Sequence, residues 1–554
     1  MKTQFTKWFC FTAILTTVLW ISTSTLMAMP ANPDELEVKQ PDGTAIKIHL
    51  RGDEWQNWIE TVSGYTIAKS EDGTWRYVSK YQRGKSSRNS VPVFVSKFAH
   101  ETPPMELAKH IRPEAPAQSL AIEQPGDLPS MAPFGPFSGP ILFILAEFDD
   151  ESGTTTEASW ASFISSSIAD FYDKGSYGDV TLTPATESSG TSNNGVINWV
   201  NVGTTHPNTG SGTGTANKQI TKNAIIAADP FVNFAAYDTD SDGYVDSDEL
   251  AIVVIVAGYE RSYSSAYSPS VWGHKWSCSS IGAPVVDGKT VADYHGGTGG
   301  YAQFGELHRS TAGNSHQATM GIMVHELGHL IFGLPDLYDT DYSSSGIGGW
   351  GVMGGGSWGR ADSDTYSGAT PVLPCAWTKY DRGWVNGSEG IGVESITAAG
   401  DGSASQANSV YRASTGDSEE FFLVENRRPV GYDAGLQRWI GTSFGGLAIW
   451  HVDEGEPDNA DDTHRLVDLE EADNTIMGSG KGESTDLWFS GNATVFDNSS
   501  SPNSKRYGGI ATQVDIRDIS AAGTVMTANF VPEPGFVFLV FNFLFLIFAR
   551  RSVI

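Results

Sequence analysis

Cysteine is scarce in this sequence. Three cysteines occur among 554 residues, and Cys10 belongs to a leader-like N-terminus. Cys278 and Cys375 remain as an even pair, either bridged in an oxidising compartment or kept as two buried thiols. Neither is accompanied by a histidine in an arrangement typical of catalysis, which excludes a cysteine nucleophile.

Positive charge is also in short supply. Lysine and arginine number 35 against 65 aspartates and glutamates, which gives a formal net charge of −30 and a pI near 4.6. This balance argues against binding to nucleic acid or to an anionic membrane surface. The sequence has no internal repeats, and its 554 residues are enough for two or three domains with a large buried core.

One motif stands out against these absences. His325, Glu326 and His329 lie in the apolar, helix-compatible run 320–332, which Gly333 ends. Positions four apart share one face of an α-helix, so both imidazoles can bind one Zn²⁺ while Glu326 acts on the attacking water as general base. Burying these groups without a metal would leave them desolvated and without partners. The motif therefore predicts a zinc hydrolase.

The third ligand is expected soon after this helix. A catalytic zinc keeps three protein ligands and one open position, whereas a structural zinc closes its shell with four, usually including cysteine. No cysteine lies near the motif, and the turn at Gly333 makes Asp336 the first candidate and Asp339 the second. Further on, the run 350–359 is too rich in glycine for a helix and is typical of a tight turn that presents Met353.

These residues resemble the immune inhibitor A family of secreted bacterial metallopeptidases. The segments that carry the resemblance are 325–329, 333–339 and 350–353. The resemblance implies a metzincin-like site in which His325, His329 and Asp336 bind zinc and Met353 forms a Met-turn beneath the metal. The family pattern places a glycine third after the second histidine, whereas Gly333 is fourth here. A broader likeness extends over roughly residues 35–530, although only the zinc segment is individually specific.

A second motif indicates a site for a hard cation. Residues 238–249 match the twelve-residue calcium loop, with carboxylates at positions 1, 3, 5 and 9, glycine at 6 and glutamate at 12. The expected Ca²⁺ ligands are Asp238, Asp240, Asp242, the carbonyl of Tyr244, Asp246 and Glu249. A β-branched run, 250–256, follows in place of a second helix. We therefore interpret the calcium as a structural brace rather than a switch.

Both ends of the chain are predicted to be targeting signals. Lys2 and Lys7 precede an apolar stretch, and small and polar residues follow, so 1–28 is predicted to be a secretory signal peptide. In 531–554, Pro-Glu-Pro precedes an apolar run too short for a stable span of about 20 residues, and two arginines follow. This tail resembles the PEP-CTERM sorting signal. The resemblance implies transient inner-membrane anchoring, processing by an exosortase and association with a polysaccharide matrix.

Composition divides the rest of the chain. Residues 29–100 are expected to form a β-rich, propeptide-like N-terminal domain, 101–139 a proline-rich linker, 140–390 the catalytic domain and 391–530 a β-rich C-terminal domain. The expected fold class is α+β, with a zincin-type catalytic domain of mixed sheet and active-site helix, and a β-sandwich-like C-terminal domain. No free cysteine lies in 29–139 to block zinc, so latency of a zymogen would come from occupation of the cleft.

The motifs together predict a secreted, calcium-stabilised zinc endopeptidase that acts on proteins or peptides. One alternative is a catalytically inactive cell-surface or matrix-binding protein on a protease scaffold, which the sorting tail and the large C-terminal region favour. Another is a zinc hydrolase of cell-wall peptides. Tyr338 and Tyr342 lie near the motif as candidates for a donor to the oxyanion, and the sequence does not choose between them.

Overall fold

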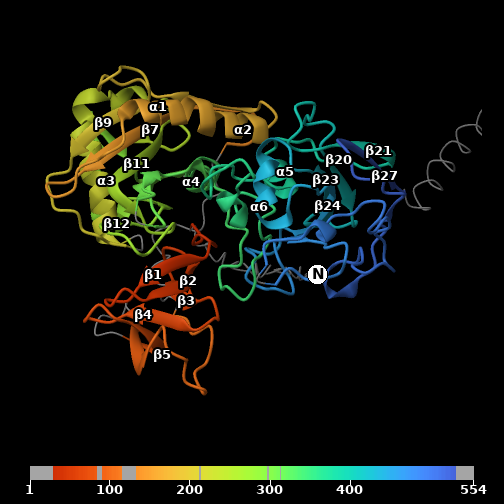
Figure 1. The fold of residues 1–554 in the computed structure, drawn as a ribbon. Helices are drawn as coiled ribbons and strands as arrows, with labels where there is room; N and C mark the ends of the chain where they lie inside the picture. Colours follow the sequence, from red (N-terminus) through yellow and green to blue (C-terminus); the bar gives the residue numbers. More distant parts are fainter. Residues whose placement is uncertain are drawn as a thin grey trace, which may run out of the picture.

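The structure is a computed structural model and describes residues 29–83, 90–114, 133–210, 214–295, 298–311, 313–478 and 480–531 (Figure 1). The predicted signal peptide at 1–28 lies outside the described residues, and so does the predicted sorting tail beyond residue 531. Residues 115–132 of the predicted linker also lie outside them. Within the described ranges, none of the helices has the length and apolar character needed to cross a bilayer.

The N-terminal region is a six-stranded antiparallel sheet whose strands neighbour one another in chain order. In its second strand, buried Ile46, Ile48 and Leu50 alternate with more exposed residues. This period of two places one face of the sheet against a hydrophobic cluster. All six strands lie between Leu36 and Phe98. The strands are β1 (Leu36–Lys39), β2 (Ala45–Gly52), β3 (Asn57–Thr61), β4 (Thr66–Lys69), β5 (Trp75–Arg83) and β6 (Ser90–Phe98).

The central region is built on an eight-stranded mixed sheet with the core order β13-β18-β11-β7-β8. Strands β7, β8, β11 and β18 pair in parallel, whereas β13 pairs antiparallel with β18 at the edge. The strands of this sheet are β7 (Phe137–Glu147), β8 (Val180–Pro184), β9 (Val196–Asn201), β11 (Ala251–Glu260), β12 (Ser270–Val271), β13 (His274–Trp276), β18 (Tyr301–His308) and β19 (His316–Gln317). Because β7 begins at Phe137, the last residues of the predicted linker belong to this sheet.

Helices cover both faces of the central sheet. Alternate residues of β7 divide between two hydrophobic clusters: Phe143 and Leu145 pack with α4, and Leu142 and Ile144 pack with α3. A strand buried on both faces must be apolar throughout, which explains the unbroken run in β11. In Figure 1, α4 lies at the middle of the molecule, between the central sheet and the C-terminal strands. The helices are α1 (Glu157–Phe163), α2 (Ala169–Gly175), α3 (Thr215–Ala228), α4 (Met320–Phe332) and α5 (Ala376–Asp381).

The C-terminal region holds a five-stranded and a three-stranded sheet. One hydrophobic cluster contains residues of both, among them Phe422, Ile449 and Met526, so the two sheets share a core as in a β-sandwich. The first sheet contains β20 (Ser388–Glu389), β22 (Val410–Ser414), β23 (Glu420–Arg427), β24 (Gly446–Asp453) and β25 (Val467–Leu469). The second contains β21 (Gly392–Thr397), β26 (Ile516–Arg517) and β27 (Val525–Phe530). A short helix, α6 (Gln437–Ile440), was not predicted, because four residues are too few for a periodic pattern.

The mixed α+β character predicted from the sequence is confirmed. Minor strands complete the structure near the predicted calcium loop: β10 (Tyr244–Val245), β14 (Val285–Val286), β15 (Lys289–Val291), β16 (Tyr294–His295) and β17 (Thr298–Gly299).

The two cysteines left open by the sequence, Cys278 and Cys375, are both free and buried. Burial raises the pKa of the Cys278 thiol to about 12, which fits a structural residue rather than a nucleophile.

Candidate metal centre

Helix α4 places two histidines on one face of a buried helix. All of its residues, from Met320 to Phe332, are buried, and it ends at Gly333 in the left-handed conformation (φ 61°). The rings of His325 and His329 lie with their centroids 4.7 Å apart. Their spacing of one helical turn accounts for this proximity. The glycine at the end of the helix then reverses the chain, which returns Asp336 toward the two rings.

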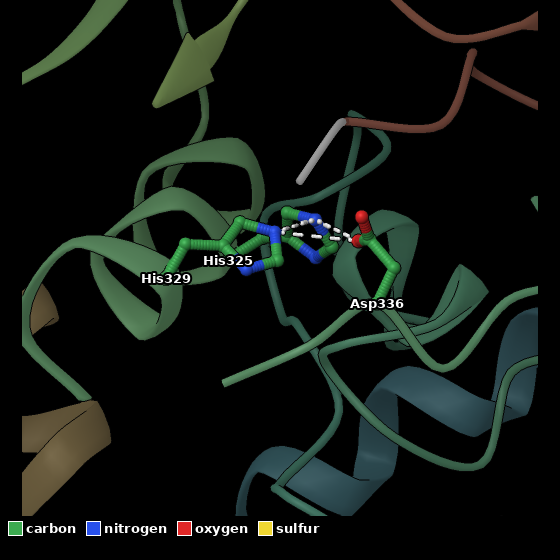
Figure 2. A group of neighbouring side chains, drawn as sticks. All are labelled: His325, His329 and Asp336. Carbon is green, nitrogen blue, oxygen red and sulfur yellow. Dashed lines mark hydrogen bonds and ion pairs between the residues drawn. The ribbon is translucent and has the colours of Figure 1, made fainter. Parts of the chain in front are cut away.

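Three side chains converge on one point (Figure 2). The Nε2 atoms of His325 and His329 are 3.1 Å apart, and Oδ1 of Asp336 lies 3.1 Å from the first and 3.3 Å from the second. Ligands held at 2.0–2.1 Å around a tetrahedral zinc are separated by about 3.3–3.4 Å. The three donors therefore have the spacing of one face of such a tetrahedron, and all three residues are at most 1% exposed.

The outer nitrogens of both rings are fixed by backbone carbonyls. Nδ1–H of His325 donates to the carbonyl of Val352 (2.9 Å), and Nδ1–H of His329 donates to that of Leu334 (2.5 Å). A carbonyl only accepts, so each neutral ring keeps its proton on Nδ1 and turns an Nε2 lone pair toward Asp336. Two lone pairs and a carboxylate facing one another fit a cation. The donor set lacks cysteine, which fits an open catalytic zinc better than a closed structural one.

Glu326 is a buried carboxylate beside this cluster. Its side chain is fully buried, and neither oxygen accepts a hydrogen bond from a side chain among the described residues. Burial raises the pKa of Glu326 to about 8; His325 opposes the shift, and the charges of Asp336 and Glu260 add to it. A buried carboxyl left without such a partner costs free energy. It is tolerated where the group has a chemical role, and the electrostatics here favour a nearby cation.

The structure separates the two candidates for the third ligand. Asp336 joins the histidines, whereas the carboxylate of Asp339 accepts hydrogen bonds from the backbone N–H groups of Asp341 (2.8 Å) and Ser344 (2.6 Å). The Asp339 carboxylate therefore stabilises the loop that follows it, through hydrogen bonds to the backbone of that loop. Sequence spacing alone could not reveal this difference, because both aspartates follow the same turn.

Met353 lies directly against the metal-site helix. A Cβ atom on Gly328, between the two histidines, would come within 2.8 Å of the Met353 sulfur. The Met353 carbonyl also accepts a hydrogen bond from the backbone N–H of Leu337 (2.8 Å), the residue after Asp336. The turn predicted to present a methionine thus contacts the helix and the segment that carries the third candidate ligand.

Two acidic residues of the N-terminal region lie near Glu326 and Asp336. The sequence analysis did not predict them. Asp53 accepts a hydrogen bond from the Tyr342 hydroxyl, and Glu54 accepts one from the Met29 N–H (3.0 Å). Burial, followed by the charges of Asp53 and Glu326, raises the pKa of Glu54 well above its usual range. Burial also raises the pKa of Asp53 to about 6. An Asp-Glu pair at the end of a strand carries no local signal of this contact.

The predicted calcium loop forms a turn with an acidic centre. Carboxylate oxygens of Asp238, Asp240 and Asp242 lie within 4.8 Å of one another. Glu249 closes the loop: its two oxygens accept backbone N–H groups, among them those of Thr239 (2.5 Å) and Asp246 (3.1 Å), which lie near opposite ends of the loop. The positive φ of Gly243 (98°) is the backbone conformation that position 6 requires.

Two cationic or polar groups adjoin this loop from outside it. The Lys289 ammonium donates to Asp238, and the ring of His295 lies 3.2 Å from Asp242 and 3.6 Å from Asp246. The predicted ligand residue Tyr244 stacks its ring on His295 at 3.9 Å between centroids. The donor set of oxygen atoms fits a hard cation such as Ca²⁺. The liganding roles of the six residues stay a prediction.

Part of this chain is similar in sequence to known metallopeptidases. Residues 164–385 match the sequence profile described as immune inhibitor A peptidase M6, catalytic domain. The match supports an immune inhibitor A-like metallopeptidase. Immune inhibitor A of Bacillus thuringiensis subsp. alesti is 29% identical over 169 residues, which cover 28% of this chain and 23% of that protein. The pre-pro-metalloprotease PrtV of Vibrio cholerae serotype O1 (strain M66-2) is 28% identical over 169 residues, 28% of this chain and 17% of that protein.

The matched segment thus spans less than a quarter of either relative. A metallopeptidase implies a metal ion and a protein or peptide substrate. The profile match over residues 164–385 includes all of α4, Asp336 and Met353. The resemblance predicted from the motifs is supported at this level, and the sorting tail falls outside the comparison.

Proposed function

We propose that this chain is a secreted zinc endopeptidase of the zincin type that hydrolyses peptide bonds in proteins. The single observation that carries the proposal is the convergence of His325 Nε2, His329 Nε2 and one Asp336 oxygen at 3.1–3.3 Å in a fully buried site. The family match over 164–385 supports the same reading. Glu326 supplies the remaining group that peptide hydrolysis needs.

The roles of the residues follow from their chemistry. His325, His329 and Asp336 would hold zinc, which supplies an acidified water and polarises the scissile carbonyl when bound. Glu326 takes a proton from the attacking water onto a carboxylate oxygen and later delivers it to the leaving nitrogen. The carbonyls of Val352 and Leu334 hold the two imidazoles in the tautomer that this arrangement needs.

We also propose that residues 29–139 form a propeptide that keeps the enzyme latent, with the catalytic domain at 140–390 and a C-terminal domain at 391–530. Contacts from the N-terminal region to the site support latency. Asp53 binds the Tyr342 hydroxyl, and Trp55 packs edge-on against Trp276 of the edge strand β13 with centroids 4.9 Å apart. A group that occupies the cleft excludes substrate without any bond to cysteine.

The ends of the chain complete the proposal. A signal peptide at 1–28 would direct export, and a PEP-CTERM-like tail at 531–554 would anchor the protein transiently in the inner membrane until an exosortase removes it. The mature protein would then be secreted or held at the cell surface in a polysaccharide matrix. N-terminal sequencing and intact mass of the exported protein would test both ends, and retention of either end in the mature form would contradict this part.

A single preparation tests the enzymatic proposal. We expect about one zinc per chain by elemental analysis, because His325, His329 and Asp336 form a single site with three protein ligands and one open position. Casein should be hydrolysed after limited trypsin treatment, with trypsin then inhibited, and hydrolysis should stop with a zinc chelator and return with added zinc. Protein that holds zinc but shows no chelator-sensitive cleavage would favour the inactive, matrix-binding alternative. Protein that holds no zinc would contradict the metal site itself.

A separate prediction concerns calcium. At a free concentration about a hundredfold above its Kd, Ca²⁺ should raise the melting temperature by about 5–10 °C, because it binds the folded loop and not the unfolded chain. Thermal unfolding of wild type and of Asp242→Asn would be compared with Ca²⁺ and with a calcium chelator. Asp248→Asn is the matched control, since residue 248 lies in the loop at a non-liganding position. If Ca²⁺ leaves the melting temperature of wild type unchanged, the loop is not stabilised by calcium.

A further inference from the structure

A group of buried charges joins the C-terminal sheet to the metal-site region. Glu425 and Arg427 lie on β23, Asp433 follows β23, and Lys379 lies on α5. All four side chains are 0% exposed. Two cations and two anions leave the group neutral. A buried charge group of this kind is weak evidence for net stability, because apolar residues of similar volume often stabilise a core as well or better.

Arg427 uses its guanidinium in two directions. Nε–H and Nη2–H donate to the two oxygens of Asp433, both at 2.7 Å. Nη1–H donates to Glu425 (3.0 Å) and to the backbone carbonyl of Trp350 (2.9 Å). The planar fork is held by Asp433, so the direction of the Nη1–H bond to Trp350 is fixed as well. Lysine cannot reproduce this geometry.

Trp350 begins the turn that contacts the metal site. Two residues further on, the Val352 carbonyl accepts the hydrogen bond from His325 Nδ1–H (2.9 Å). The next residue, Met353, packs against Gly328 and binds the backbone of Leu337. The turn therefore sets the orientation of the first histidine ring and contacts the segment after Asp336. Its first carbonyl is held from the C-terminal sheet by Arg427.

We infer that Arg427 is a positioning residue of the metal centre, acting through the Trp350 carbonyl on the turn whose Val352 carbonyl orients His325. This inference rests on the proposed zinc site. A residue of the C-terminal sheet would thus help to position the metal ligands, although Arg427 contacts neither substrate nor metal. Groups that orient a metal-binding histidine typically change metal affinity 10- to 100-fold when they are altered.

The neighbouring Lys379 supplies a matched control. Its ammonium is equally buried and pairs with Glu425 at 2.9 Å. Burial lowers the pKa of Lys379, but the charge of Glu425 more than offsets this and raises it to about 12, so the side chain is a cation. It belongs to the same charge group as Arg427, but its ammonium donates to the Glu425 carboxylate rather than to the turn.

The test measures zinc affinity of the full chain by competition with a chromophoric chelator. Arg427→Lys should weaken zinc binding about 10- to 100-fold and alter the visible spectrum of the Co²⁺-loaded protein. Lys379→Met should lower the melting temperature yet keep zinc affinity within about threefold of wild type. The double variant Arg427→Met with Asp433→Leu removes both members of a charge pair, so it tests the lost Trp350 contact even if the lysine variant folds poorly.

The outcomes separate this inference from the function on which it rests. If wild type binds zinc but both Arg427 variants bind it equally well, the inference fails and the proposed function stands. Equal loss of affinity in the Arg427 and Lys379 variants would also overturn it, because it would assign the effect to general destabilisation. Wild type that binds no zinc would overturn both.

Discussion

Replacing Glu326 by glutamine is expected to lower casein hydrolysis by trypsin-activated protein about 10²- to 10⁴-fold, the range that a general acid–base group contributes. Glutamine has nearly the same shape but cannot take a proton from the attacking water. Glu326 is absent from the converging set of His325, His329 and Asp336, so zinc content should be unchanged. The measurement pairs the rate of casein cleavage with elemental analysis of the same sample.

Glu306→Gln provides the control for this substitution. Glu306 is also a fully buried glutamate, but its carboxylate accepts hydrogen bonds from the N–H groups of Thr154 (2.7 Å) and Thr155 (2.5 Å). Its change should lower stability and leave the rate per folded molecule near wild type. A Glu326→Gln enzyme that retains more than about a tenth of the wild-type rate would remove Glu326 from the mechanism.

The second large effect concerns latency. In the precursor, which begins at Met29 and keeps 29–139, Trp55→Ala is expected to raise casein hydrolysis about 10- to 30-fold. Trp55 packs on Trp276 of β13, beside the helix that carries the histidines. Trp55 is partly buried. Loss of an interface tryptophan that anchors a contact typically costs about 2 kcal/mol, which corresponds to about a 30-fold larger open fraction. The activity of untreated precursor and variant would be compared with that of the trypsin-treated forms.

Phe98→Ala is the matched aromatic control. Phe98 lies on β6 of the N-terminal sheet and contacts His100 and Arg76, all within the N-terminal region. It should leave the precursor latent. Wild-type precursor that is already as active as the trypsin-treated enzyme would refute the propeptide proposal, and so would a Trp55→Ala precursor with unchanged activity.

The pairing of the two histidines with Glu326 follows from local geometry. Helix α4 forms from a mostly apolar segment that Gly333 ends, and the helical period brings positions 325 and 329 together whatever surrounds the helix. The predicted calcium loop is local in the same sense, because glycine at position 6 and the acidic pattern of 238–249 specify its turn. The β-rich N-terminal region was also predictable, because the alternation of burial in β2 repeats a pattern of the sequence.

The choice between Asp336 and Asp339 was not local. Both follow the same glycine turn, and both are about 1% exposed. The structure separates them because Leu337 N–H is held by the Met353 carbonyl, and Asp339 is occupied by the N–H groups of its own loop. The free state of Cys278 and Cys375 was likewise decided by where the fold places each thiol.

The sequence by itself determined the chemistry available to this protein: two imidazoles and a carboxylate on one helix, and an acidic loop, each encoded within a few residues. Only the tertiary structure decided what surrounds them. Asp53 and Glu54 reach the site from a separate sheet, and Arg427 reaches the turn beneath His325 from another. Contacts between residues so far apart in the chain depend on how whole sheets pack, and no periodicity or motif encodes that packing.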